Sequence, residues 1–433
     1  MLTNRFFDIT AFGAAPGGEA PCTQAFASAV AAAATAGGGT IYVPAGIFLT
    51  GPIRFTDNMT LYLETGARIV FSRDPAEYPI VRMRWEGAEC DCHMPQLFGE
   101  GLRNIAVAGR GEIDGQGEPW WKLHRERRLA YPRPRLLSFV GCRHVLIEGV
   151  QLINSPSWTI NPILCEDVTV DKVTIVNQPD SPNTDGINPE SCRNVRISNC
   201  HIDVGDDCIA IKAGRENCLP RAACENITIS NCTMVHGHGG VVIGSEMSGD
   251  VRNVVIANCI FESTDRGIRI KSRRGRGGVV EDVRVSNIIM RNVICPFVLH
   301  LYYNCGEGGC AEAVWDKKQR PVTAATPAIR RIHFSDITAG EVRAAAGFIY
   351  GLPEMPIEQI TFDHISVRMA ADAPPALPAM MSDLEPMSRQ GFICCNVRDV
   401  SFSGISISGQ EGPAYRLENA RGIEWEGSEV GEA

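Results

Sequence analysis

A short pattern of alternating β-branched residues recurs along this 433-residue chain at a nearly constant spacing. Each copy begins with Asn or Asp and continues with Val, Ile or Thr in a strand-like run, and several copies end in Asn-Cys. Copies begin at Asp167, Asn194, Asn226, Asn253 and Asp282, so the successive steps are 27, 32, 27 and 29 residues. A fixed period in this range indicates a repeat architecture, in which each unit buries its apolar face by stacking on its neighbours.

The short length and β-branched content of these runs predict an all-β fold, and the period favours a parallel β-helix. Coils stacked about 4.8 Å apart would pair every strand with its neighbours. The recurring Asn and Cys residues would then form ladders at equivalent turn and core positions. A β-sandwich is the alternative, but it favours Asn-Gly or Asp-Gly hairpins, which are not the dominant connections here.

One helix is predicted from an Ala-rich stretch at about residues 21–36, which ends at Gly37–Gly39. A helix at this place is expected to cap the open end of the coil stack. Because no linker or low-complexity segment interrupts the chain, residues 1–433 are predicted to form a single β-helix domain.

The net charge of −9 argues against nucleic acid as a partner. The absence of a run of about 18 apolar residues argues against a membrane span. An acidic ligand would therefore need a local basic patch, and one dense candidate exists. Its members are Arg266, Arg269, Lys271, Arg273, Arg274 and Arg276.

The 17 cysteines and the first residues of the chain bear on its compartment. The N-terminus has no apolar core behind a basic start, which favours a cytoplasmic location over secretion. An odd and large cysteine count then favours reduced thiols, including Cys305 and Cys310. Cys90, Cys92 and His93 lack a second Cys/His pair at a zinc-like spacing, so no metal site is predicted there.

Four polar blocks recur at about the coil period: NTDG at 183–186, GDDC at 205–208, GHG at 237–239 and RIK at 269–271. Residues one period apart in stacked coils lie on the same face. Taken alone, each block is typical of a turn, a solvated pair, a loop residue or an exposed strand face. In register, the blocks predict one patch that holds three carboxylates, an imidazole and two cations.

Such a patch has the parts that glycoside hydrolysis needs. One carboxyl group must be protonated so that it can give a proton to the leaving oxygen. Another must be ionised so that it can activate water or attack carbon. Crowding of the carboxyls of Asp185, Asp206 and Asp207 raises the pKa of at least one of them by like-charge repulsion. Arg269 and Lys271 are suited to bind a substrate carboxylate.

These blocks resemble those of the polygalacturonase family, glycoside hydrolase family 28. The stretches Gly37–Phe48, Gly111–Trp121 and Ile153–Pro162 are also similar to bacterial, exo-type members. The resemblance covers nearly the whole chain. It implies a right-handed parallel β-helix and hydrolysis of α-1,4-galacturonosidic linkages in an acidic pectic oligosaccharide or polysaccharide, with inversion and without a metal or organic cofactor.

The resemblance also implies a role for each site residue. Asp206 would be the general acid, and Asp185 and Asp207 would hold and activate water. His238 would tune the protonation of the acid. The substrate-binding residues would be Arg269, Lys271, Asn183 and Tyr302, with Tyr303 as suitable as Tyr302. Asn161 stands where many members have His, which affects substrate detail.

Two further features bear on the mode of cleavage. Insertions at 82–97 and 131–135 would wall off one end of a cleft, and a cytoplasmic enzyme would meet oligosaccharides; both predict exo action. The alternatives are a rhamnogalacturonan-type galacturonohydrolase, a calcium-dependent pectate lyase and a non-catalytic carbohydrate-binding β-helix. The sequence leaves the oligomeric state open.

Overall fold

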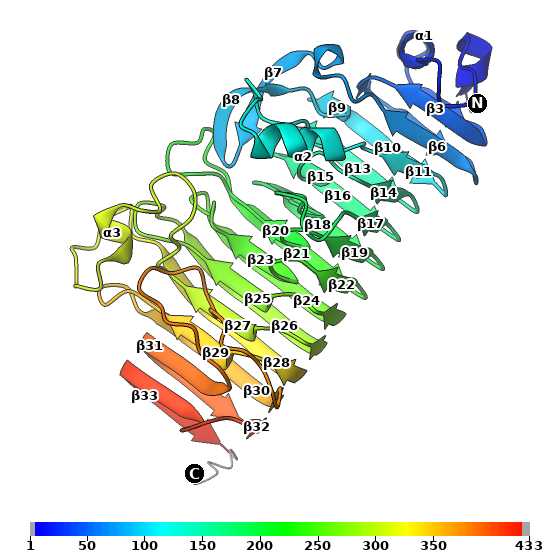
Figure 1. Ribbon diagram of the computed structural model, residues 1–433. Coiled ribbons are helices and arrows are strands. Elements are labelled where there is room, and N and C mark those ends of the chain that lie inside the picture. Colours follow the sequence, from blue (N-terminus) through cyan, green and yellow to red (C-terminus); the bar gives the residue numbers. More distant parts are fainter. Residues whose placement is uncertain (1–4, 427–433) are drawn as a thin grey trace. The chain divides into compact units, whose positions relative to one another are not determined.

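The computed structural model describes residues 5–426, and the chain divides into two compact units, Met1–Asp206 and Asp207–Ala433. Both consist of successive coils of a right-handed parallel β-helix, as predicted (Figure 1). The prediction of one domain stays a prediction. Within the described range, no helix combines the length and apolar character needed to cross a membrane.

In the first unit, each coil contributes strands to up to three parallel ladders. The first ladder contains β1 (Phe6–Asp8), β2 (Gly39–Val43), β5 (Met59–Leu63), β10 (Arg103–Gly109), β13 (Arg143–Glu148), β16 (Glu166–Asp171) and β18 (Arg193–Ser198). The second contains β3 (Gly46–Thr50), β6 (Ala67–Phe71), β11 (Glu112–Asp114), β14 (Gln151–Ile153), β17 (Thr174–Val176) and β19 (His201–Val204). The third contains β4 (Ile53–Arg54), β9 (Leu97–Glu100), β12 (Leu137–Val140) and β15 (Ile160–Ile163).

The second unit repeats this plan with longer strands that bend across two faces. One ladder contains β20 (Ile209–Ile211), β23 (Val241–Gly244), β25 (Arg266–Lys271), β27 (Cys295–His300) and β29 (Ala345–Tyr350). The other strands are β21 (Cys224–Ser230), β22 (Thr233–His236), β24 (Val251–Glu262), β26 (Val279–Arg291), β28 (Ala328–Val342), β30 (Ile357–Met369), β31 (Gln390–Ser403), β32 (Ser406–Ser408) and β33 (Tyr415–Glu426).

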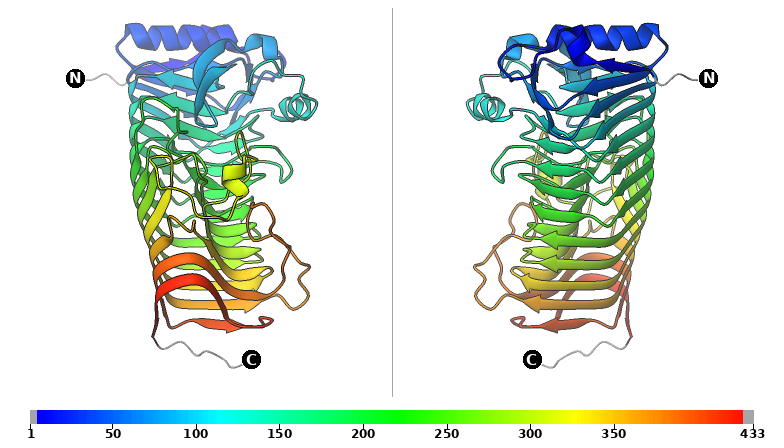
Figure 2. Two further views of the ribbon diagram at one scale, coloured as in Figure 1. Left: turned by 90° about the vertical axis from the view of Figure 1, so that its left-hand side faces the viewer. Right: turned by 90° about the vertical axis from the view of Figure 1, so that its right-hand side faces the viewer.

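The predicted N-terminal helix is present as α1 (Thr23–Thr35), and it packs on β1 to β4 through Ala25, Phe26, Ala29 and Ala33 (Figure 2). The other helical segments were not predicted; they are η1 (Ile9–Phe12), η2 (Pro75–Glu77), α2 (Glu118–Arg125) and α3 (Glu312–Trp315). The one antiparallel hairpin pair among the named strands of the described range, β7 (Ile80–Trp85) with β8 (Ala88–His93), was not predicted as strands either.

The repeat places its residues as expected. Asn226 and Asn253 adopt left-handed φ angles of 59° and 57°, which asparagine tolerates better than most residues. The Asn253 amide donates to Asn226 Oδ1 at 3.1 Å, so the turns of successive coils form a ladder. Cys232 and Cys259 are both 2% exposed, which confirms that the cysteines of the repeat belong to the core. Because these ladders fix the register, polar loops one period apart come to the same edge.

Candidate active site

Asp185 lies in the long connection between β17 and β18, and the coil before it fixes its backbone. The amides of Thr159 and Ile160 donate to the carbonyls of Asp185 and Gly186, each at 2.9 Å. The Asp185 side chain is 3% exposed, and its Oδ2 accepts a hydrogen bond from the Asn188 amide at 2.9 Å. The carboxylate is therefore held in place before any substrate binds.

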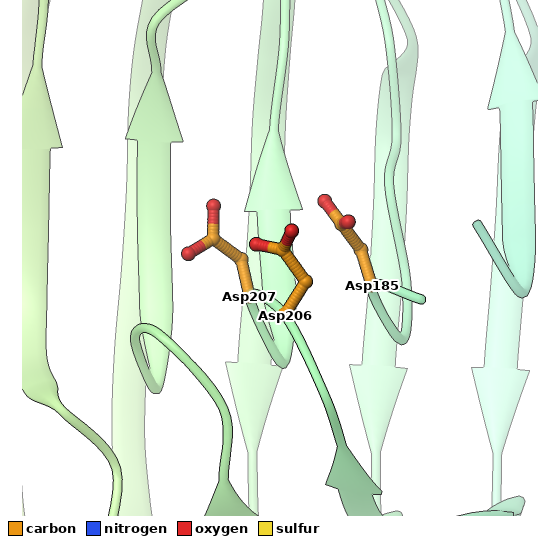
Figure 3. Close-up of side chains that lie close together, drawn as sticks. All are labelled: Asp185, Asp206 and Asp207. Carbon is orange, nitrogen blue, oxygen red and sulfur yellow. The ribbon is translucent and has the colours of Figure 1, made fainter. Parts of the chain in front are cut away.

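Asp206 closes the first unit, two residues after β19, and it is half-buried. One carboxylate oxygen of Asp185 and one of Asp206 lie within 4.8 Å of each other. Asp207 follows in the chain, and Figure 3 shows the side chains of all three aspartates close together. The first two polar blocks thus combine as their spacing predicts.

Asp207 opens the second unit and is only 2% exposed. The register runs from Ile209 through Val241 to Ile268, so the blocks GDDC, GHG and RIK occupy three successive coils. Two coils separate Asp207 from β25, a distance of roughly 10 Å along the axis. The side chains of Lys271 and Asp207 together bridge this distance, with Lys271 Nζ 2.9 Å from Asp207 Oδ2.

Asp207 is ionised because cations surround it. Burial alone would raise the pKa of this carboxyl, but Lys271, then Arg269 and Lys212, outweigh burial and hold the pKa well below its usual range. Arg269 Nη1 lies 3.6 Å from Asp207 Oδ1. A carboxylate that stays ionised at every working pH can accept a proton or orient water, but it cannot serve as the acid.

Arg269 has N–H donors on its guanidinium that are not used in hydrogen bonds to the described part of the chain. Its guanidinium is 1% exposed, and within residues 5–426 its Nε and Nη2 have no hydrogen-bond partner. Buried unpaired donors cost free energy, of order 1–3 kcal/mol each, unless a ligand or water pairs with them. They suit a planar carboxylate, which two parallel N–H groups of one guanidinium can bind.

His238 is more exposed than the aspartates, with 52% of its side chain accessible. Its Nδ1 lies 2.9 Å from Asp265 Oδ2. Burial opposes the charge on Asp265, but the bond from His238 and the nearby Arg266 lower the pKa of this carboxyl overall. The ionised Asp265 therefore places a proton on Nδ1 and fixes the orientation of the ring.

The two tyrosines after β27 differ in their contacts. Tyr302 is 1% exposed, and its ring lies 4.2 Å from Lys317 Nζ. The Tyr303 ring lies 5.1 Å from Lys271 Nζ and 5.8 Å from the Arg269 guanidinium carbon. Tyr303 is thus the tyrosine that packs on the basic pair, and the role of Tyr302 in sugar binding stays a prediction.

Three residues near these groups were missed by the sequence reasoning. Asp265 follows His238 by 27 residues, one coil period, and that spacing is the signal that would have found it. His300 pairs in register with Lys271 and is fully buried, and burial followed by the nearby Arg269 and Lys271 keeps its pKa well below the usual value. Arg133 contacts Asn183, through Nη2 and Oδ1 at 2.6 Å. Arg133 lies in the predicted insertion 131–135, but no local pattern marks this residue or His300 as part of the site.

The family comparison and the similar proteins of known name support one family. The model of glycosyl hydrolases family 28 matches residues 39–374. A probable polygalacturonase of Vitis vinifera is 33% identical over 389 residues, which cover 87% of this chain and 77% of the relative. An endo-polygalacturonase of Pectobacterium carotovorum is 30% identical over 301 residues, covering 65% and 72%.

Among solved structures, the hyperthermoactive exopolygalacturonase of Thermotoga maritima matches with a TM-score of 0.77 and 29% identity, over 93% of each chain. With the matched family region spanning most of the coils described above, the chain belongs to family 28 of the glycosyl hydrolases.

Proposed function

We propose that the chain hydrolyses α-1,4-galacturonosidic linkages of polygalacturonate or its oligomers. The observation that carries this proposal is the buried Asp207 held by Lys271 and Arg269, next in the chain to the Asp185–Asp206 pair. Carboxylates serve acid and base chemistry, and unpaired Arg269 donors suit an acidic sugar. The polygalacturonase names of the relatives support the same substrate class.

In this proposal Asp206, the half-exposed member, is the general acid that protonates the leaving oxygen. Asp207 is ionised throughout, and with Asp185 it orients and deprotonates the attacking water. His238, oriented by Asp265, tunes the protonation of Asp206. Arg269 and Lys271 bind the carboxylate of the sugar, and Asn183 and Tyr302 are proposed as further sugar contacts.

We propose that hydrolysis proceeds with inversion, as the family resemblance implies. Oxygens within 4.8 Å are nearer to the separation of about 5–5.5 Å that is typical of retaining enzymes than to about 6.5–9.5 Å. Two carboxylates assigned to one water favour a single displacement all the same. Proton NMR of the first product should show the β-anomer, released from an α-linkage. Initial release of the α-anomer would contradict inversion.

We also propose exo action, because the β7–β8 hairpin is clamped beside the Asp185 loop. Arg84 of the hairpin forms a buried ion pair with Glu190, Nη1 to Oε1 at 3.4 Å. Trp85 stacks on Trp158 with ring centroids 5.1 Å apart, and Trp158 precedes the residue that bonds to the Asp185 carbonyl. Arg135 lies over both rings, at 5.3 and 4.9 Å.

A hairpin so fixed would close one side of the substrate path, and a closed path limits cleavage to chain ends. Product sizing on polygalacturonate should therefore show short, uniform products from the first minutes. Trp85→Ala should loosen the hairpin and add longer oligomers to the early products. Trp425→Ala, at a tryptophan that is 43% exposed on β33, is the matched control and should leave the product pattern unchanged. Mixed long oligomers from the unaltered enzyme would rule out exo action.

A further inference from the structure

Arg133 ties together three segments of the first unit. It lies just before β12 and is 1% exposed. Its Nη1 donates to the carbonyls of Pro156 and Pro182 at 3.0 and 2.6 Å, and its Nη2 donates to Asn183 Oδ1 at 2.6 Å. Pro156 belongs to the connection between β14 and β15, and Pro182 and Asn183 lead directly into Thr184 and Asp185.

This arrangement requires the shape of an arginine. The planar guanidinium presents donors in a fixed fork, so two nitrogens reach three acceptors from two loops at once. A lysine has one nitrogen on a flexible stem, and it would satisfy only part of this set. Pro156 and Pro182 lie in irregular connections, outside the strand ladders that pair backbone carbonyls elsewhere in the described residues.

The charge of Arg133 also acts on the site. Burial lowers the pKa of Arg133 to about 10, opposed by Glu86, Asp185 and Asp206, so the group stays cationic at neutral pH. Arg125 and His124 of α2 are the other titratable groups beside it. The attraction is mutual: the carboxylates favour the charged form of Arg133, and the fixed cation favours the ionised forms of Asp185 and Asp206.

We propose that Arg133 is a positioning residue for hydrolysis: it holds the Pro182–Asn183 segment so that the Asp185 carboxylate faces Asp206, and it supplies a buried positive charge to that pair. The inference rests on the proposed function. The proposal also gives Asn183 a second role, because its side-chain Oδ1 accepts the hydrogen bond from Arg133. Geometry and charge are separate contributions, and two variants separate them.

Arg133→Met removes both contributions, whereas Arg133→Lys keeps the charge and loses part of the fork. For Arg133→Met we expect kcat on polygalacturonate to fall about 10–100-fold with KM changed less than about threefold, since misplacement of a reacting group mainly affects the chemical step. The acid limb of the kcat/KM profile should move to higher pH. Arg133→Lys should return that limb toward its original position and recover little of kcat.

Arg135 offers a matched control on the same segment. It is also 1% exposed, but its contacts are Met83 Sδ, the Arg84 carbonyl and two tryptophan rings. Arg135→Met should lower the thermal midpoint and alter early products without moving the acid limb. If Arg133→Met does not fold, Arg133→Lys still tests the proposal. This variant should keep the acid limb of the pH profile in place while kcat falls.

The outcomes separate this inference from the proposed function. An unaltered enzyme that does not cleave polygalacturonate at all would refute the proposed function. An unaltered enzyme that cleaves, beside Arg133 variants that lose thermal stability but keep kcat and the pH limb, would refute the positioning role. A variant whose KM rises while kcat stays constant would also refute it, because Arg133 would then act in substrate binding.

Discussion

Asp206→Asn is expected to reduce kcat on polygalacturonate by about 10²–10⁴-fold, the range over which general acids usually contribute. An amide is nearly the same size as a carboxyl group, but it cannot supply a proton to the departing sugar oxygen. The thermal midpoint should stay within a few degrees of the original, since Asp206 is half-buried and the first unit keeps its strand ladders. Initial rates and a melting curve test both statements.

The role of Asp206 is separated from that of Asp207 by the leaving group. The phenolate of an aryl galacturonide made from an acidic phenol departs without protonation, so Asp206→Asn should slow cleavage of this substrate far less than cleavage of the polymer. Asp207→Asn should slow both substrates alike, because each still needs the activated water. Equal losses on both substrates for Asp206→Asn would show that Asp206 is not the acid. Undiminished activity would refute the assignment outright.

The coil architecture was predictable because its physics is local and repeated. If equivalent segments stack, the apolar alternation in the copies at Asn226 and Asn253 predicts that Ile227 pairs with Val254, as observed. The polar blocks follow from the same register, so the approach of Asp207 to Lys271 was implied by spacing alone. Even Asp265 was within reach of this reasoning, one period beyond His238.

The features that the sequence did not predict do not recur at the coil period. Arg133 lies 52 residues before Asp185 in an irregular segment, and no repeat relates the two. The β7–β8 hairpin is antiparallel, so its residues stack on no equivalent residue of a neighbouring coil. His300 is buried beside a cluster of cations, a surrounding that appears only when several coils are assembled. Side-chain contacts that follow the coil period, such as that of Lys271 with Asp207, were predictable, whereas contacts that do not follow it were not.

The second large effect is expected from Lys271→Met, which should destabilise the protein by about 3–5 kcal/mol at pH 7. Lys271 and Asp207 have side chains only 7% and 2% exposed, and removal of one partner leaves a buried carboxylate with less compensation. Lys172→Met is the matched surface control. Lys172 also forms ion pairs, with Glu148 and Asp171, but it is 62% exposed, so the cost should stay below about 1 kcal/mol.

The pH dependence identifies the source of this loss. The folded pKa of Asp207 lies below its unfolded value of about 3.9, so its ion pairs stabilise the fold fully above that pH and less as pH falls through the folded value. The gap in urea midpoint between the original protein and Lys271→Met should thus be full at pH 7 and narrow below about pH 4. A gap that is independent of pH would mean that lost packing, not charge, causes the effect.

The double variant Asp207→Asn/Lys271→Met tests stability and catalysis separately. The double variant has no ionised Asp207 left without Lys271, but the buried Arg269 loses its ion pair with Asp207, so the double variant should regain only part of the stability that Lys271→Met loses. It should regain none of the activity, since both the carboxylate proposed to activate water and a cation proposed to bind the sugar carboxylate are gone. Stability that recovers while catalysis does not would separate the two tasks of this pair. In the proposed function the Lys271–Asp207 pair stabilises the second unit and Lys271 also binds the carboxylate of the sugar, so a chain of net charge −9 would bind an acidic ligand through a local basic patch.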